Sequence, residues 1–153
     1  MNTEQSIDVL NALVVINNDR IEGYTTASKE AEESDLKTLF AQFEHTSQKC
    51  KAELVQEVQR LGGEPAEGTK TTGKIYRAWM DIKATLTGND RKAILNSCEY
   101  GEDVAIEAYE DALNNNAEDL SIEQQSMLKN QLQMIKVDHD KVKGLRDTIT
   151  EHA

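Results

Sequence analysis

Hydrophobic residues recur every three or four positions along most of the chain, which is the spacing of one buried helical face. In the first segment this stripe consists of Ile7, Leu10, Leu13, Val14, Ile21 and Tyr24. Similar stripes follow farther along, separated by short polar stretches. The pattern predicts four long amphipathic helices, over residues 4–33, 35–61, 90–115 and 121–150.

Glycine, proline and polar residues mark the ends of these helices. Gly62 and Gly63 follow the second stripe, where glycine commonly ends a helix. Ser121 and Gln124 form a capping-box pattern at the start of the last helix. Residues 62–73 contain the only proline and four of the eight glycines, so they predict a loop. A short amphipathic helix is predicted after it, over residues 74–86.

The lengths of the connections predict how the helices are arranged. A turn of about two residues makes the first two helices antiparallel neighbours. The long loop and the short helix can carry the chain back to the opposite end, because about 13 helical residues cover ~20 Å. We therefore expect an all-α, ferritin-like four-helix bundle with a long crossover containing a short extra helix between helices 2 and 3. We expect residues 1–153 to form a single domain.

Composition and charge limit the classes of partner. The 28 acidic and 17 basic residues give a net charge of −11, which disfavours nucleic acid and anionic membranes. The amino terminus lacks the basic and apolar segments of a signal peptide, and no apolar stretch approaches the ~18 residues of a membrane span. A cytoplasmic location is expected. Cys50 and Cys98 fall on apolar faces, so we expect free thiols there.

Polar residues that interrupt the apolar stripes at mid-helix are the candidates for chemistry. Ferritin-like bundles that bind iron or manganese place Glu on two helices and Glu-x-x-His on the other two, because hard cations need several carboxylates. In this chain Asp19 is expected to lie off the stripe, toward solvent. The interrupting residues, in chain order, are Asn17, Ser47, Glu102, Asp138 and His139, and the pattern leaves open which of the last two faces the core.

These five residues allow two interpretations. The first is a buried polar layer that is hydrogen-bonded across the bundle and fixes its register. The second is a reduced site for one divalent metal on Glu102, Asp138 and His139. No Glu-x-x-His occurs anywhere in the chain. We therefore favour the polar layer and predict no catalytic, cofactor-binding or metal-binding residue.

Several segments taken together resemble a known family. They are residues 17–24 (NNDRIEGY), 61–65 (LGGEP), 77–83 (RAWMDIK) and 98–103 (CEYGED), with Tyr109, His139-Asp140 and Leu145-Arg146. In this combination the chain resembles uncharacterised bacterial ferritin-like four-helix-bundle proteins, small single-domain products sometimes found among stress-associated genes. The resemblance implies the crossover bundle and implies little about activity. Asn17 and Ser47 depart from the motif of the metal-binding relatives.

The combined prediction is a non-catalytic structural or interaction protein, with a link to stress response implied by the resemblance. We expect it to form a homo-oligomer, with a dimer favoured, and not to act as an enzyme. The alternative is a metal-binding (iron or manganese) or redox protein with a reduced ferritin-like site.

Overall fold

The computed structural model describes residues 3–68, 80, 84 and 91–152. Four long helices make up most of this part of the chain: α1 (Thr3–Glu30), α2 (Ser34–Arg60), α4 (Arg91–Asn115) and α5 (Ile122–His152). A short 3-10 helix, η1 (Ala117–Asp119), precedes α5. No strand occurs among the described residues, so the predicted all-α class and the four-helix bundle are confirmed.

The helix boundaries lie close to those predicted from the sequence. The largest difference is at the end of α1, which stops at Glu30 and not at residue 33. Residues 35–61, 90–115 and 121–150 of the prediction correspond to α2, α4 and α5. The short helix predicted over residues 74–86 lies outside the described residues, apart from residues 80 and 84.

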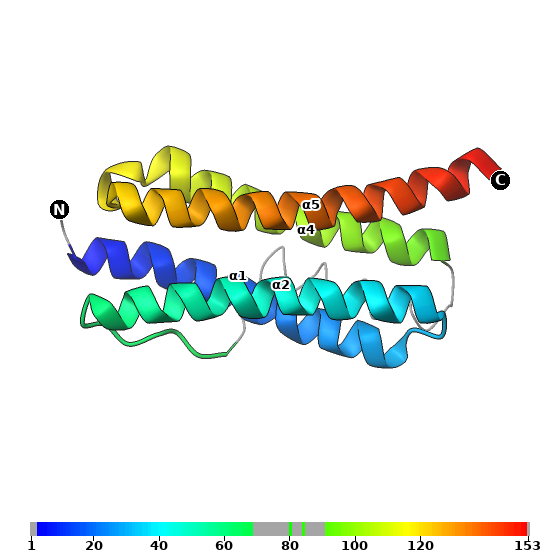
Figure 1. Ribbon diagram of the computed structural model, residues 1–153, viewed down its shortest axis with the longest axis horizontal. Helices are drawn as coiled ribbons and strands as arrows, with labels where there is room; N and C mark the ends of the chain where they lie inside the picture. The colour runs from blue at the N-terminus through cyan, green and yellow to red at the C-terminus, as the bar shows by residue number, and fades with distance from the viewer. Residues whose placement is uncertain (1–2, 69–79, 81–83, 85–90, 153) are drawn as a thin grey trace.

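The four helices form two antiparallel hairpins that pack on each other (Figure 1). The first hairpin is α1 with α2, and the second is α4 with α5. The end of α2 and the start of α4 lie at opposite ends of the bundle (Figure 1). α2 and α4 therefore point in the same direction.

Two glycines end α2 and start this crossover. The N–H of Gly63 donates to the carbonyl oxygen of Val58 at 3.0 Å, and that of Gly62 donates to Gln59 at 3.0 Å. Gly62 has φ = 84°, a conformation that side-chain-bearing residues rarely adopt. A Cβ atom on Gly63 would lie 2.8 Å from the side chain of Ile7. Gly62 therefore occupies a backbone conformation that favours glycine, and a side chain on Gly63 would require Ile7 to move.

The first residues of the crossover are held against α1. The Asn11 side chain donates to the carbonyl oxygen of Glu64 at 3.0 Å and accepts from the N–H of Ala66 at 2.8 Å. Asn18 donates to the carbonyl oxygen of Gly68 at 2.8 Å. These contacts direct the chain along α1 as it leaves α2.

The core consists of two apolar clusters at different heights of the bundle. One cluster includes Leu13, Leu54 and Leu128, and the other includes Phe40 and Leu95. Burial of these side chains supplies the main driving force for folding. Buried polar residues lie between the two clusters, and these define the candidate site. No described helix is both long and apolar enough to cross a membrane.

Candidate functional site: a buried arginine at the centre of the bundle

Arg20 lies at the centre of the bundle and has no solvent-exposed surface. The fully or almost fully buried residues of α1 include a run spaced by steps of three and four: Leu10, Leu13, Asn17, Arg20, Tyr24 and Ala27. This spacing keeps one face of a helix directed at the core over many turns. Arg20 thus occupies a core position, although its side chain is charged.

The guanidinium group of Arg20 contacts one polar residue from each of the other three helices. Its Nη1 donates to Oγ of Ser47 on α2. Its Nη2 donates to Oε1 of Glu102 on α4 at 2.7 Å and to Oδ2 of Asp138 on α5 at 3.3 Å. Glu102 is fully buried, and Asp138 is 4% exposed. We call Arg20, Ser47, Glu102 and Asp138 the central layer.

Two buried tyrosines, Tyr24 and Tyr109, form further hydrogen bonds next to the central layer. The Tyr24 hydroxyl donates to Oε1 of Glu102, and Cζ of Arg20 lies 5.6 Å from the centroid of the Tyr24 ring. On the other side, Nδ2 of Asn17 donates to the Tyr109 hydroxyl at 2.9 Å. That hydroxyl donates to Oε1 of Gln131 at 2.6 Å. Hydrogen bonds therefore link all four helices at mid-height.

Burial and charge act in opposite directions on the ionisable groups of this layer. Burial disfavours the cation of Arg20, but Glu102, Tyr24 and Asp138 outweigh that effect and raise its pKa above the ordinary value. Burial raises the pKa of Asp138 to about 6, and the charge of Glu102 adds to the rise, whereas Arg20 opposes it. Arg20 is consequently charged at every accessible pH, and the raised pKa of Asp138 lies close to neutrality.

The central layer is not fully hydrogen-bonded. Nε of Arg20 and Oε2 of Glu102 are buried and have no hydrogen-bond partner among the described residues. An unsatisfied buried polar atom costs about 1–3 kcal/mol, and buried ion pairs are often no more stable than a packed apolar core. We therefore interpret the central layer as a device that fixes how the helices align.

Most of the sequence-predicted polar residues lie in or beside this layer, but His139 does not. Asn17, Ser47, Glu102 and Asp138 are buried. The prediction that His139 belongs to the buried layer is wrong: it follows Asp138 directly, which turns it about 100° around α5, and its side chain is 17% exposed.

The three residues of the alternative metal site, Glu102, Asp138 and His139, are not brought together. Glu102 and Asp138 bind Arg20, whereas His139 contacts Glu99 and Asp103, so the three proposed ligands do not form one cluster.

Arg20 itself was missed by the sequence interpretation, which took Ile21 as the inward residue of that turn. The position of Arg20 could have been predicted from its spacing. It lies three residues after Asn17 and four before Tyr24, so it continues the buried stripe of α1. Asp19, expected to face solvent, is 3% exposed.

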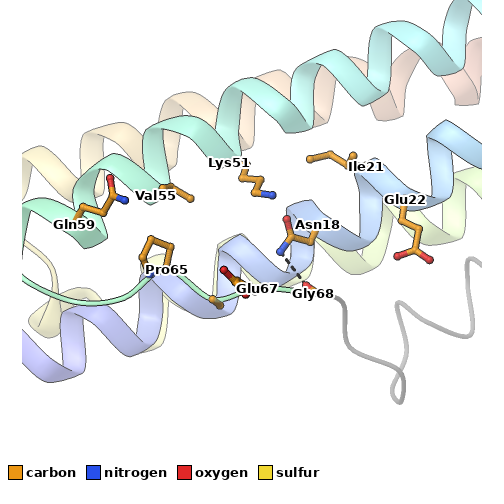
Figure 2. Close-up of a pocket in the computed structure, with 10 residues that line it drawn as sticks. Asn18, Ile21, Glu22, Lys51, Val55, Gln59, Pro65, Glu67 and Gly68 are labelled. Atoms are coloured by element: carbon orange, nitrogen blue, oxygen red, sulfur yellow. Dashed lines mark hydrogen bonds between the residues drawn. The ribbon is translucent and has the colours of Figure 1, made fainter.

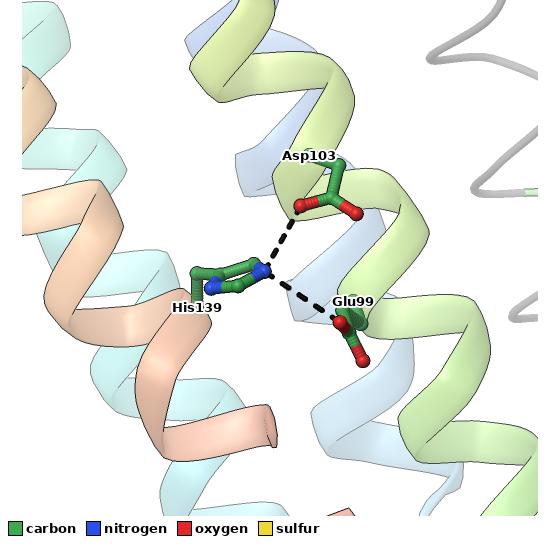
Figure 3. Close-up of side chains that lie close together, drawn as sticks. All are labelled: Glu99, Asp103 and His139. Atoms are coloured by element: carbon green, nitrogen blue, oxygen red, sulfur yellow. Dashed lines mark ion pairs between the residues drawn. The ribbon is translucent and has the colours of Figure 1, made fainter. Parts of the chain in front are cut away.

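A second group of ionisable residues lies at the surface between α4 and α5 (Figure 3). Nε2 of His139 lies 2.9 Å from Oδ1 of Asp103 and 3.7 Å from Oε1 of Glu99. Glu99 and Asp103 are four residues apart, so α4 presents both carboxylates on one face. Arg146 forms an ion pair with the other oxygen of Glu99. We call Glu99, Asp103 and His139 the surface triad.

A groove of about 560 Å³ lies where the start of the crossover meets α1 and α2 (Figure 2). Its charged lining residues, Glu22, Lys51 and Glu67, are of mixed sign. Asn18 and Gly68 both line this groove and are joined by the hydrogen bond described above (Figure 2). This arrangement holds the crossover in place and brings no nucleophile or set of metal ligands together.

Together, these features define an all-α four-helix bundle whose centre is a buried arginine–carboxylate layer. The chain belongs to the family described as domain of unknown function (DUF2383), whose family model matches residues 5–115. This match includes α1, α2 and α4, and with them Arg20, Ser47 and Glu102 of the central layer. No curated protein shows significant sequence similarity to the chain.

Proposed function

We propose that this protein is a ferritin-like four-helix bundle that acts as a non-catalytic structural or interaction protein. The crossover between α2 and α4 supports the ferritin-like assignment, because such folds join two antiparallel hairpins by one long connection. The position of Arg20 between Glu102 and Asp138 carries the non-catalytic part of the proposal.

The residues at the centre of the bundle do not fit a two-metal site. Such a site needs carboxylates from all four helices, two of them with a histidine three residues later. Here α1 and α2 supply Arg20 and Ser47 instead, and both carboxylates of the layer already bind the guanidinium group. A metal cation and Arg20 would compete for the same oxygen atoms with charge of the same sign. We therefore expect no metal-based redox step at this centre.

Self-association is the interaction we propose, with a dimer as the expected state. It is supported by a groove of about 590 Å³ between α1 and α4, which is lined mainly by apolar side chains: Val9, Ala12, Leu13, Val15, Ile16, Ala108, Asp111, Ala112 and Asn116. Association over such a surface removes apolar area from water. A link to stress response rests on the family resemblance alone.

Iron oxidation tests the non-catalytic proposal directly. Purified protein is mixed with Fe(II) in air, and formation of Fe(III) is followed by absorbance. We expect the rate to equal that of a protein-free control, and Glu102→Gln and Asp138→Asn to leave it unchanged. Oxidation that is faster than the control and is lost in the Glu102→Gln variant, with helicity intact by circular dichroism, would overturn the proposal.

A further inference from the structure

We propose that the surface triad, Glu99, Asp103 and His139, is a binding site for a single divalent transition-metal ion, with Zn(II) as the best-fitting probe. One imidazole nitrogen and two carboxylate oxygens are a ligand set that suits Zn(II), Mn(II) and Fe(II). The site is separate from the central layer and is independent of the function proposed above.

The spacing of the donor atoms supports this assignment. The three ligand atoms lie within 4.8 Å of one another. In a tetrahedral zinc site with bonds of about 2.0–2.2 Å, two ligand atoms are about 3.4 Å apart. The distances from Nε2 of His139 to Asp103 (2.9 Å) and to Glu99 (3.7 Å) lie on either side of that value. Small side-chain adjustments would therefore let one ion bind all three.

Neighbouring groups hold two of the ligands in a suitable orientation. Nδ1 of His139 lies 3.2 Å from Oδ1 of Asp140, so it can donate its hydrogen to that carboxylate while a metal takes the place of the proton on Nε2. Arg146 pairs with Oε2 of Glu99, while Oε1 of Glu99 faces His139. Polar contacts of this kind to the outer atoms of ligands are typical of protein metal sites.

Exposure and charge also favour a cation here. The side chains of His139 and Glu99 are 17% and 16% exposed, and that of Asp103 is 57% exposed, so an ion can reach the site from solvent. Arg146 offsets only part of the negative charge of Glu99, Asp103 and Asp140. Three protein ligands leave at least one coordination position open to water or to another ligand.

Zn(II) titration by isothermal calorimetry tests the site in the full-length protein. We expect wild-type protein, stripped of metal with a chelator and dialysed, to bind one Zn(II) per chain. His139→Gln, Glu99→Gln and Asp103→Asn should each weaken binding more than about tenfold, because even loss of an outer hydrogen-bond partner costs 10–100-fold in affinity. His45→Gln changes an exposed histidine on α2 and should have no effect.

Two results would overturn the proposal. One is the absence of Zn(II) binding at micromolar concentration to the wild-type protein. The other is binding that persists unchanged in any of the three triad variants. Because Glu102→Gln alters the central layer and not the triad, it should leave Zn(II) binding intact. Iron oxidation that depends on Glu102 would therefore contradict the proposed function but would leave the proposal of a Zn(II) site at the surface triad unaffected.

Discussion

At the scale of single residues, the carboxyl group of Asp138 shows how a position inside the bundle changes ionisation. Burial raises its pKa from 3.8 to about 6 in the folded protein. The folded state therefore binds this proton more tightly than the unfolded state does. The resulting contribution to stability is complete below about pH 4 and is lost as the pH rises through about 6.

This linkage predicts a pH-dependent difference between wild-type protein and the Asp138→Asn variant. Relative to the variant, the wild type should lose about 2 kcal/mol of unfolding free energy between about pH 4.5 and pH 7.5, because only the wild type gives up the proton. Urea denaturation at several pH values measures this difference.

The matched control is Asp8→Asn, which removes an exposed carboxylate on α1. Its stability should run parallel to that of the wild type across the same range. A constant difference between wild type and Asp138→Asn would show that the ionisation of Asp138 is not coupled to folding.

At the scale of helices, the residues that cap the start of α5 also connect it to a neighbouring helix. The N–H of Gln124 donates to Oγ of Ser121 at 3.0 Å, and the Ser121 N–H donates to Oε1 of Gln124 at 2.9 Å. This is the predicted capping box. The Gln124 amide also donates to Oε2 of Glu57 at 2.8 Å, which joins the start of α5 to α2.

Removing this cap should lower the stability of the bundle. We expect Ser121→Ala to reduce the free energy of unfolding by about 1 kcal/mol, because the Gln124 N–H loses its acceptor. Chemical denaturation provides the measurement. Ser126→Ala is the control, since this exposed serine lies within α5 and alanine favours helix there. Equal stability of the two variants would argue against a role for the cap.

Helices and their ends could be predicted from the sequence because both depend on local signals. Apolar periodicity located α1, α2, α4 and α5, and Gly62 and Ser121 marked two boundaries. The direction of individual side chains was less predictable. A difference of one residue in helical phase kept His139 among the core candidates and excluded Arg20 from them. The Arg20–Glu102 contact joins residues 82 positions apart, so it depends on how α1 and α4 align.

At the scale of the whole molecule, the central layer takes one residue from each helix of the bundle. Arg20 supplies the positive charge to which Glu102 and Asp138 are both bound, and apolar clusters lie above and below. A shift of α1 by one turn would remove Arg20 from the layer and leave the buried Glu102 and Asp138 without their cation. The layer thus selects one alignment of the two hairpins.

The most direct test of this account is the effect of Arg20→Met on stability in two backgrounds, measured by urea denaturation. In the wild type it should cost about 3–5 kcal/mol, because Glu102 and Asp138 would remain buried without their cation. In a protein that already carries Glu102→Gln and Asp138→Asn, Arg20→Met should reduce the free energy of unfolding by at least about 2 kcal/mol less than in the wild type. An equal cost in both backgrounds, or a wild-type loss below about 1 kcal/mol, would contradict a bundle centre organised by Arg20.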